Sequence, residues 1–341
     1  MKICINACKC AMYPVPYINI KIFWEERDKW KKTMGHRREN ALVLGSSEGF
    51  RDASERLPTE LRRKKAEDAL VGDFNNDLRP DIWLVAKANR KGAHAEDVLY
   101  LNTGQSFIDA SKPAGLDSHA FDSRNGSVGD FDNDGDLDVY VVNSNYSPDI
   151  AGTNAANVLW ENIGNRTLTK DAVQHQVPIF RPRSGPGFAP SDDNGLSDTV
   201  AVGELNGDGV LDLIVANSPG SLIRNRPELL VRGTYDLFLG VDHAPNHWLI
   251  VDLIGTTSNR EGVGAVVHAA AEGITRLRTA DHGIHFKTQN DPRLHFGFGA
   301  LAPETLIRLD VFWPSGIRQT IVGVAPNQVL EVTEPPGEPS R

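Results

Sequence analysis

The fold of this chain follows from one acidic stretch, V-G-D-F-D-N-D-G-D-L-D at residues 128–138, which leads directly into the apolar run Val139–Val142. Related acidic stretches lie at residues 71–81 and 202–212, and each also leads into a short apolar run. Short runs rich in β-branched residues and bounded by Asp, Asn and Gly are typical of strands joined by turns. The sequence therefore predicts three acidic loops, each followed by a β-strand.

A second marker repeats with the same period. The segment Phe50–Ser54 (FRDAS) returns as Phe107–Ser111 (FIDAS), and Asp73 returns as Asp130 at the same interval. Two independent markers with one period indicate a structural repeat, and a repeat of several short strands predicts propeller blades. The interval from Asp130 to Glu204 of the third acidic loop is longer. We assign the excess to a surface loop within residues 177–198, which are rich in Pro, Gly, Ser and Asp.

The acidic loops carry oxygen ligands at a spacing that suits a metal ion. Side chains at loop positions 1, 3 and 5 turn toward one point, position 7 adds a backbone carbonyl, and an acid at position 9 completes the set. Oxygen ligands at this density select a hard cation, and a flexible loop favours Ca²⁺ over Mg²⁺. The candidate ligands are Asp73, Asn75, Asp77 and Asp81 in loop one, Asp130, Asp132, Asp134, Asp136 and Asp138 in loop two, and Glu204, Asn206, Asp208, Val210 and Asp212 in loop three.

The three loops differ in their expected affinity for the ion. Loop two has carboxylates at every side-chain position and Gly135 at position 6, where the chain takes a left-handed turn. Loop three begins with the longer Glu204, whereas loop one has Leu78 in place of the turn glycine and Arg79 beside it. We expect Ca²⁺ to bind most tightly to loop two, more weakly to loop three and least to loop one, which we interpret as vestigial.

The acidic loops have two other interpretations, an EF-hand and a turn that binds no metal. An EF-hand requires a bidentate Glu at position 12 and an exiting helix, but position 12 holds Leu84, Val141 or Val215, so an EF-hand is excluded. The loops could also be polar Asx-type turns that bind no metal. The in-register repetition of the acids favours the metal.

Composition limits the class of protein. With 341 residues, of which 40% are hydrophobic and 24% charged, most of the chain can bury a core and is not disordered. The net charge of −9 argues against a nucleic-acid partner, and no apolar run is long enough to predict a membrane span. All three cysteines lie within the first ten residues, so no disulfide framework is expected. Residues 1–40 carry no repeat unit and make a poor signal peptide.

The C-terminal part has a different pattern. Residues 246–334 alternate apolar and polar side chains between Gly and Pro turns, which predicts a small antiparallel β-sandwich. This part contains, in order, NHWL at 246–249, SNREGVGA at 258–265, HFGFG at 295–299, WPSG at 313–316 and NQ at 327–328. Together these motifs resemble the ASPIC/UnbV domain of the cartilage acidic protein 1 family, and the acidic stretches resemble the FG-GAP or VCBS repeats.

The resemblance extends over residues 41–334 and implies a domain order. We expect an irregular N-terminal segment at 1–40, propeller-type FG-GAP/VCBS repeats at 41–240, an ASPIC/UnbV β domain at 246–334 and a disordered tail at 335–341. Residues 41–240 hold about three and a half repeats, fewer than the smallest closed propeller. The predicted fold is therefore all-β, with a partial (open or incomplete) β-propeller. It either stays open, closes with another chain, or lacks upstream blades.

The resemblance also implies a function. It suggests an extracellular or periplasmic, non-catalytic Ca²⁺-binding protein in recognition or adhesion, with a glycan or protein ligand at the cell surface. The alternatives are a polysaccharide lyase or hydrolase on the propeller scaffold, and a truncated gene product without an independent function. His282 and His285 could approach His295 and hold zinc, but we expect His295 to satisfy backbone groups instead.

Overall fold

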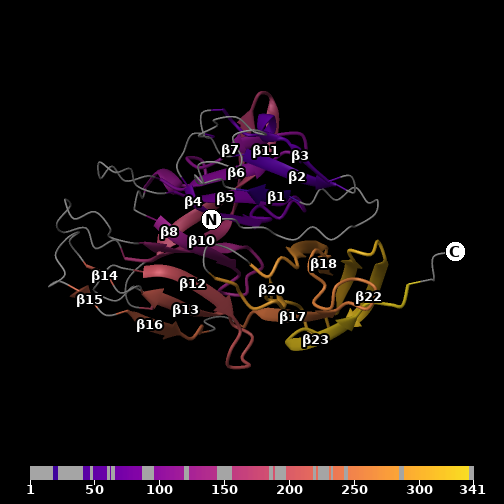
Figure 1. Ribbon diagram of the computed structural model, residues 1–341. Helices are drawn as coiled ribbons and strands as arrows, with labels where there is room; N and C mark the ends of the chain where they lie inside the picture. The colour runs from indigo at the N-terminus through magenta and orange to yellow at the C-terminus, as the bar shows by residue number, and fades with distance from the viewer. Residues whose placement is uncertain are drawn as a thin grey trace.

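The computed structural model is all-β, with an arc of blade-like sheets beside a C-terminal sandwich (Figure 1). The structure describes residues 18–21, 41–46, 49–59, 62, 66–86, 96–118, 123–143, 156–183, 187–188, 197–217, 220–221, 230–231, 233–241, 245–283 and 288–337. Within these ranges two short 3₁₀ helices occur, η1 (Ser54–Arg56) and η2 (Leu116–Ser118). No helix of the described residues has the length and apolar character that crossing a membrane requires.

The arc begins with an N-terminal sheet of β1 (Ile18–Lys21), β2 (Ala41–Ser46) and β3 (Gly49–Asp52). Strand β1 pairs antiparallel with β2, from Ile18 opposite Leu44 to Lys21 opposite Ala41. The segment that we expected to be irregular therefore contributes a strand at Ile18–Lys21, because β2 offers it an edge to pair with. The rest of residues 1–40 lies outside the described residues.

Three further sheets carry the repeat. Sheet one consists of β4 (Ala66–Gly72), β5 (Asp81–Ala86), β6 (Val98–Asn102) and β7 (Phe107–Asp109). Sheet two consists of β8 (Ser123–Gly129), β9 (Asp138–Asn143), β10 (Val158–Lys170) and β11 (Val173–Arg183). Sheet three consists of β12 (Ser197–Gly203), β13 (Asp212–Asn217) and β16 (Thr234–Phe238), and β14 (Gly220–Ser221) pairs separately with β15 (Leu230–Val231). Because β4 contacts β8 and β8 contacts β12, the sheets follow one another as propeller-like blades.

The FRDAS and FIDAS markers form the same turn. Ser54 donates to Asp52 Oδ1 from both its backbone N–H, at 2.9 Å, and its hydroxyl, at 2.5 Å. Ser111 donates to Asp109 Oδ1 in the same two ways, at 2.9 and 2.6 Å. Identical hydrogen bonds at equivalent positions of the two segments confirm the predicted repeat.

Sheet one packs face to face on sheet two, and sheet two packs on sheet three. Between sheets one and two, Trp83 and Leu99 pack with Val139 and Phe180, and the rings of Trp83 and Phe180 meet edge to face at 5.0 Å between centroids. Between sheets two and three, the core contains Tyr140, Val142, Val200, Val202, Leu213 and Val215. The core of the arc therefore lies between sheets, as in stacked blades.

The predicted surface loop at residues 177–198 begins later than expected. Residues 177–183 belong to β11, which pairs with β10 as far as Arg183 opposite Leu159. Val177 and Phe180 are buried in the core between sheets one and two. Some of the extra residues therefore lengthen the β10–β11 hairpin, because Val177 and Phe180 pack into that core.

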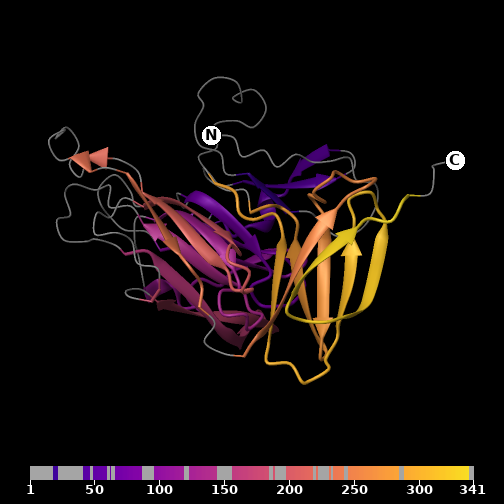
Figure 2. The same ribbon diagram turned by 90° about the horizontal axis from the view of Figure 1, so that it is seen from below.

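The C-terminal module is a two-sheet sandwich (Figure 2). One sheet contains β17 (His247–Ile254), β20 (Leu294–Gly299) and β23 (Gln328–Thr333), and the other β18 (Val266–Ala271), β19 (Ile274–Thr279), β21 (Ile307–Phe312) and β22 (Arg318–Val324). The pairing differs from the antiparallel expectation in one place, because β23 runs parallel to β17. Trp313 lies in the core between the sheets. Of the predicted disordered tail, residues 338–341 lie outside the described residues.

Candidate metal site at the acidic loops

The three acidic loops connect the first two strands of each repeat sheet and share one backbone conformation. Left-handed residues occur at positions 4 and 6 of each loop: Asn76, Leu78, Asn133, Gly135, Gly207 and Gly209. Leu78, at φ 64°, therefore adopts the conformation that glycine takes in the other two loops, although its Cβ makes that conformation strained. Loop one keeps the turn without the turn glycine.

The Asp at position 9 fastens each loop to its sheet with both carboxylate oxygens. In loop two, Asp138 Oδ2 accepts the N–H of Phe131 at 3.0 Å, and Oδ1 accepts the N–H of Asn162 at 2.7 Å. The equivalent hydrogen bonds are those of Asp81 with Phe74 and Asn102, and those of Asp212 with Leu205 and Gly240. Because the second donor lies on or just beyond the strand that neighbours the loop's own second strand, this carboxylate joins the loop to the sheet in all three repeats.

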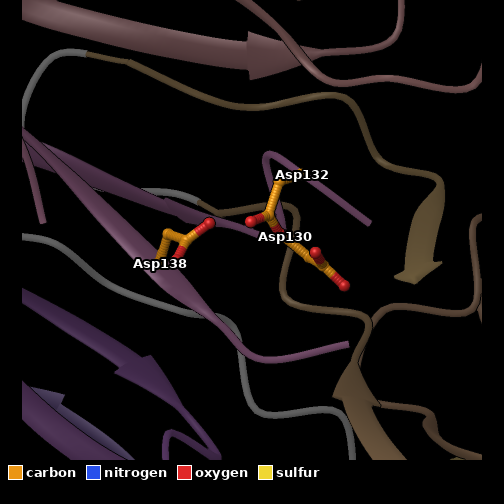
Figure 3. A group of neighbouring side chains, drawn as sticks. All are labelled: Asp130, Asp132 and Asp138. Carbon is orange, nitrogen blue, oxygen red and sulfur yellow. The ribbon is translucent and has the colours of Figure 1, made fainter. Parts of the chain in front are cut away.

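Loop two gathers three carboxylates around one point (Figure 3). Asp130, Asp132 and Asp138 each offer one oxygen, and these oxygens lie within 4.8 Å of one another. Asp130 Oδ1 is buried and has no hydrogen-bond partner. Burying a carboxylate oxygen costs free energy unless a cation or a water molecule pairs with it. These residues therefore fit a hard cation such as Ca²⁺. Among the residues that the structure describes, this is the one group of this kind.

The other two candidates of loop two lie outside this group. Asp134 Oδ1 accepts the backbone N–H of Asp136 at 2.7 Å. Asp136 Oδ1 accepts Asn76 Nδ2 from loop one at 2.6 Å and lies 3.9 Å from the guanidinium of Arg276. The side chain of Asp136, whose backbone carbonyl is the predicted ligand, thus links loops one and two.

Burial and mutual repulsion raise the pKa values of the loop-two carboxyls. Burial raises the pKa of Asp130 to about 8, although the charge of Arg278 opposes the shift. Burial, with repulsion from Asp132 and Asp130, raises the pKa of Asp138 well above its usual value. The pKa of Asp134 rises to about 7 through burial and the neighbouring Asp132. A cation in this group would offset the repulsion and favour the ionised forms.

Loop three uses its polar side chains to close its own turn. Glu204 Oε1 accepts the N–H groups of Gly207 and Asp208, the latter at 3.0 Å. Asn206 Nδ2 donates to Asp208 Oδ2 at 2.8 Å, and Asp208 Oδ1 accepts the N–H of Val210 at 2.8 Å. The predicted ligands of loop three are therefore engaged with one another, and their carboxylates do not form a converging group of the loop-two kind.

Loop one engages its carboxylates internally. Both oxygens of Asp73 accept backbone N–H groups, from Asp77 and Leu78, each at 2.9 Å. Asp77 Oδ2 pairs with the guanidinium of Arg79 and accepts Asn75 Nδ2 at 3.0 Å. The positive charge of Arg79 thus offsets that of the Asp77 carboxylate, as a bound cation would. The lower affinity expected of loop one stays a prediction.

The C-terminal module lies directly against loop two. The N–H of Gly297 donates to Asp130 Oδ2 at 3.0 Å, and the N–H of Gly299 donates to the carbonyl of Asn133 at 2.7 Å. A Cβ at position 297 would collide with the Asp130 carboxylate and the Asn133 backbone. A glycine is therefore required at this contact, and its motif serves the junction with the acidic loop.

The module also contacts loop three and the outer side of loop two. His295 Nε2 lies 3.0 Å from the carbonyl of Gly209, so the prediction that His295 satisfies a backbone group is confirmed. The ring of Trp248 lies so close to Gly209 that no Cβ would fit there. Asn246 Nδ2 donates to the carbonyl of Asp132 at 2.8 Å. In the zinc alternative, His285 lies outside the described residues.

Two buried arginines of β19 face the same acidic loop. Arg278 NH2 lies 3.9 Å from Asp130 Oδ2, and its Nε donates to the carbonyl of His295 at 3.0 Å. Arg276 approaches Asp136 at the same distance of 3.9 Å. The C-terminal module therefore supplies positive charge to loop two, next to the three-carboxylate group.

Sequence reasoning did not single out Arg276 and Arg278. A signal for them exists in the segment ITRLRT at 274–279, where the two arginines are two residues apart and so lie on one face of a strand. A pair of cations on one face of a strand requires an acidic partner only where that face is buried. Nothing in the local pattern says that the partner is loop two.

Repeated acidic loops on stacked sheets, closed on one side by a β-sandwich, define a class of all-β repeat proteins. Residues 73–141 match the FG-GAP-like repeat, and residues 255–339 match the family ASPIC and UnbV. These two matches confirm the resemblance stated from the motifs.

The chain is also similar to cartilage acidic protein 1 from several vertebrates. It is 25% identical to the protein from Homo sapiens over 307 residues, which are 88% of this chain and 41% of that protein. It is 26% identical to the protein from Mus musculus over 275 residues, or 79% and 37%, and 26% identical to that from Xenopus tropicalis over 268 residues, or 78% and 36%. The chain thus spans less than half of the length of these curated relatives.

Proposed function

We propose that this protein is a non-catalytic recognition protein that binds Ca²⁺ at loop two. The observation that carries the proposal is the convergence of Asp130, Asp132 and Asp138, with the buried Asp130 Oδ1 lacking a hydrogen-bond partner. These three side chains would hold the ion. The ion supplies positive charge that ties a repulsive turn together, which is a structural role.

The proposed location is outside the cell, and the proposed ligand is a glycan or protein on a cell surface. The similarity to cartilage acidic protein 1 supports this location, and extracellular modules function with Ca²⁺ affinities in the millimolar range. The ligand class is tested by incubating labelled protein on a glycan array and on intact cells, with Ca²⁺ or with EDTA. Calcium-dependent retention supports the proposal, and equal retention in EDTA contradicts it.

The metal is tested by titrating Ca²⁺ into the EDTA-treated and dialysed chain, with calorimetry and thermal melts as readouts. We expect one dominant site and a higher Tm with Ca²⁺. Asp132→Asn keeps an oxygen that can accept the N–H of Asp134 but removes a charge from the ligand group. It should weaken Ca²⁺ binding by about tenfold or more. It should not lower the Tm in EDTA, because it removes a charge that repels Asp134 and Asp138.

The matched control is Asp77→Asn in loop one, where the carboxylate already pairs with Arg79. We expect this variant to bind Ca²⁺ as the unmodified chain does. A chain that shows neither heat of binding nor a change in Tm would contradict the calcium site, and equal losses in the two variants would contradict its assignment to loop two.

A further inference from the structure

Arg278 of β19 buries a positive charge next to loop two. The residue is only 9% exposed, and arginine keeps its charge in proteins. Its Nη2 has no hydrogen-bond partner and lies 3.9 Å from Asp130 Oδ2, which is beyond hydrogen-bond distance. A buried charge costs free energy unless an opposite charge compensates it. The fully buried carboxylate of Asp130 is that opposite charge.

The guanidinium of Arg278 is held in place by the C-terminal module itself. Its Nε donates to the carbonyl of His295 and its Nη1 to the carbonyl of Leu277, each at 3.0 Å. Its central carbon also lies 5.5 Å from the ring centre of the buried Phe296, a distance at which an aromatic face attracts a cation. These contacts fix a positive charge at loop two without any ligand from the loop.

Loop one obtains its positive charge from its own sequence, whereas loop two does not. Arg79 at position 7 of loop one forms an ion pair with Asp77. Loop two has Asp136 at the same position, and residues 128–138 contain neither Lys nor Arg. The positive charge that compensates the carboxylates of loop two therefore comes from another part of the chain, the C-terminal module.

Arg278 approaches the oxygen of Asp130 that is already engaged in hydrogen bonds. That oxygen, Oδ2, accepts the N–H groups of Gly135 and Gly297, whereas Oδ1 has no hydrogen-bond partner. The guanidinium thus compensates the charge of Asp130 without taking Oδ1. A positive charge at this place stabilises the metal-free carboxylates, and it repels a divalent cation that binds to them.

We propose that Arg278 is a resident counter-charge of loop two, which stabilises the metal-free loop and lowers the affinity of the site for Ca²⁺. This inference rests on the proposed Ca²⁺ site and assigns the control of its affinity to the C-terminal module. Arg278 does not touch the ion in this role and acts only through its charge. When Ca²⁺ binds, the ion takes over the compensation of the carboxylates against the repulsion of the guanidinium.

The test titrates Ca²⁺ into the EDTA-treated full chain and into Arg278→Gln, with calorimetry for the affinity and the Tm in EDTA as a second readout. The titration is made at pH 9, where proton release from the carboxyls contributes least. We expect Arg278→Gln to bind Ca²⁺ about tenfold or more tightly and to have a lower Tm in EDTA. Structural damage alone would weaken binding, so the direction of the change separates the two effects. Arg278→Lys keeps the charge and should bind Ca²⁺ within about threefold of the unmodified chain.

The matched control is Arg308→Gln, which removes the same charge from an exposed side chain of the same module, where Arg308 pairs with Asp310. It should leave the Ca²⁺ affinity unchanged, and an equal gain in both variants overturns the role of Arg278.

The remaining outcomes separate this inference from the proposed Ca²⁺ site. An unmodified chain that binds Ca²⁺, together with an Arg278→Gln variant that binds no more tightly, overturns the inference alone. So does an Arg278→Gln variant with an unchanged Tm in EDTA, or one that stays unfolded in saturating Ca²⁺. Absence of Ca²⁺ binding in both chains overturns the inference and the proposed site together.

Discussion

The two carboxylate oxygens of Asp130 differ in their hydrogen bonding. Oδ2 accepts the N–H of Gly135 within loop two at 2.9 Å and the N–H of Gly297 from the C-terminal module at 3.0 Å. Oδ1 is left without a hydrogen bond, on a carboxylate that converges with those of Asp132 and Asp138. One oxygen thus fixes the position of the side chain, while the other remains available to a cation.

The raised carboxyl pKa values predict how stability depends on pH. The pKa values of Asp130 and Asp134 rise to about 8 and about 7, so the folded metal-free chain binds more protons than the unfolded chain between pH 4 and 8. Its stability therefore falls as the pH rises through this range. We expect the Tm in EDTA to decrease from pH 5 to pH 8, and saturating Ca²⁺ to flatten that decrease. A rising Tm in EDTA would contradict this prediction.

Residue spacing predicted the candidate ligands but not which of their side chains converge. The spacing of loop two named Asp134 and Asp136 together with Asp130, Asp132 and Asp138. The structure turns Asp136 to Asn76 of loop one, a residue 60 positions away in the sequence. Rotamers of this kind depend on neighbours from other repeats, which a local pattern does not contain.

At the scale of elements, the repeated unit is an acidic loop fastened to its sheet by the position-9 Asp. This arrangement recurs in all three loops, including loop one, whose candidate ligand Asp73 accepts backbone N–H groups instead. The fastening therefore does not depend on the cation. It explains how loop one keeps its shape with Leu78 in a strained left-handed conformation.

Replacing Asp81 tests this fastening. Asp81→Asn retains one acceptor oxygen but sets an amide N–H₂ against one of two backbone donors, from Phe74 and Asn102. Because Asp81 is fully buried, we expect a loss of about 1–3 kcal/mol in the free energy of unfolding, equal in EDTA and in Ca²⁺. Urea denaturation measures the loss. A loss that appears only with Ca²⁺ would instead make Asp81 a metal ligand.

At the scale of the whole molecule, the C-terminal module packs directly against the acidic loops of the arc. Its glycines, Gly297 and Gly299, donate to loop two, and His295 meets loop three. Arg278 adds positive charge beside Asp130. Binding of a cation at loop two and docking of the module therefore act on the same carboxylate.

Gly297→Ala tests this junction. The added Cβ would meet Asp130 and Asn133, so we expect a lower Tm and weaker Ca²⁺ binding together. The control is Gly273→Ala in the same module, where a Cβ meets nothing within 4 Å but the left-handed conformation costs about 1–2 kcal/mol. The control should lower the Tm without a change in Ca²⁺ affinity. If both variants bind Ca²⁺ normally, the module does not influence the site.

The repeat, the acidic loops, the strands that follow them and the resemblance of both parts to known families all follow from the amino-acid sequence alone. These features are local, because spacing and alternation record what a short segment can form. Which carboxylates converge, and which module covers them, depends on the tertiary structure. Those outcomes rest on contacts such as Gly297 with Asp130, 167 residues apart, and only packing brings such pairs together.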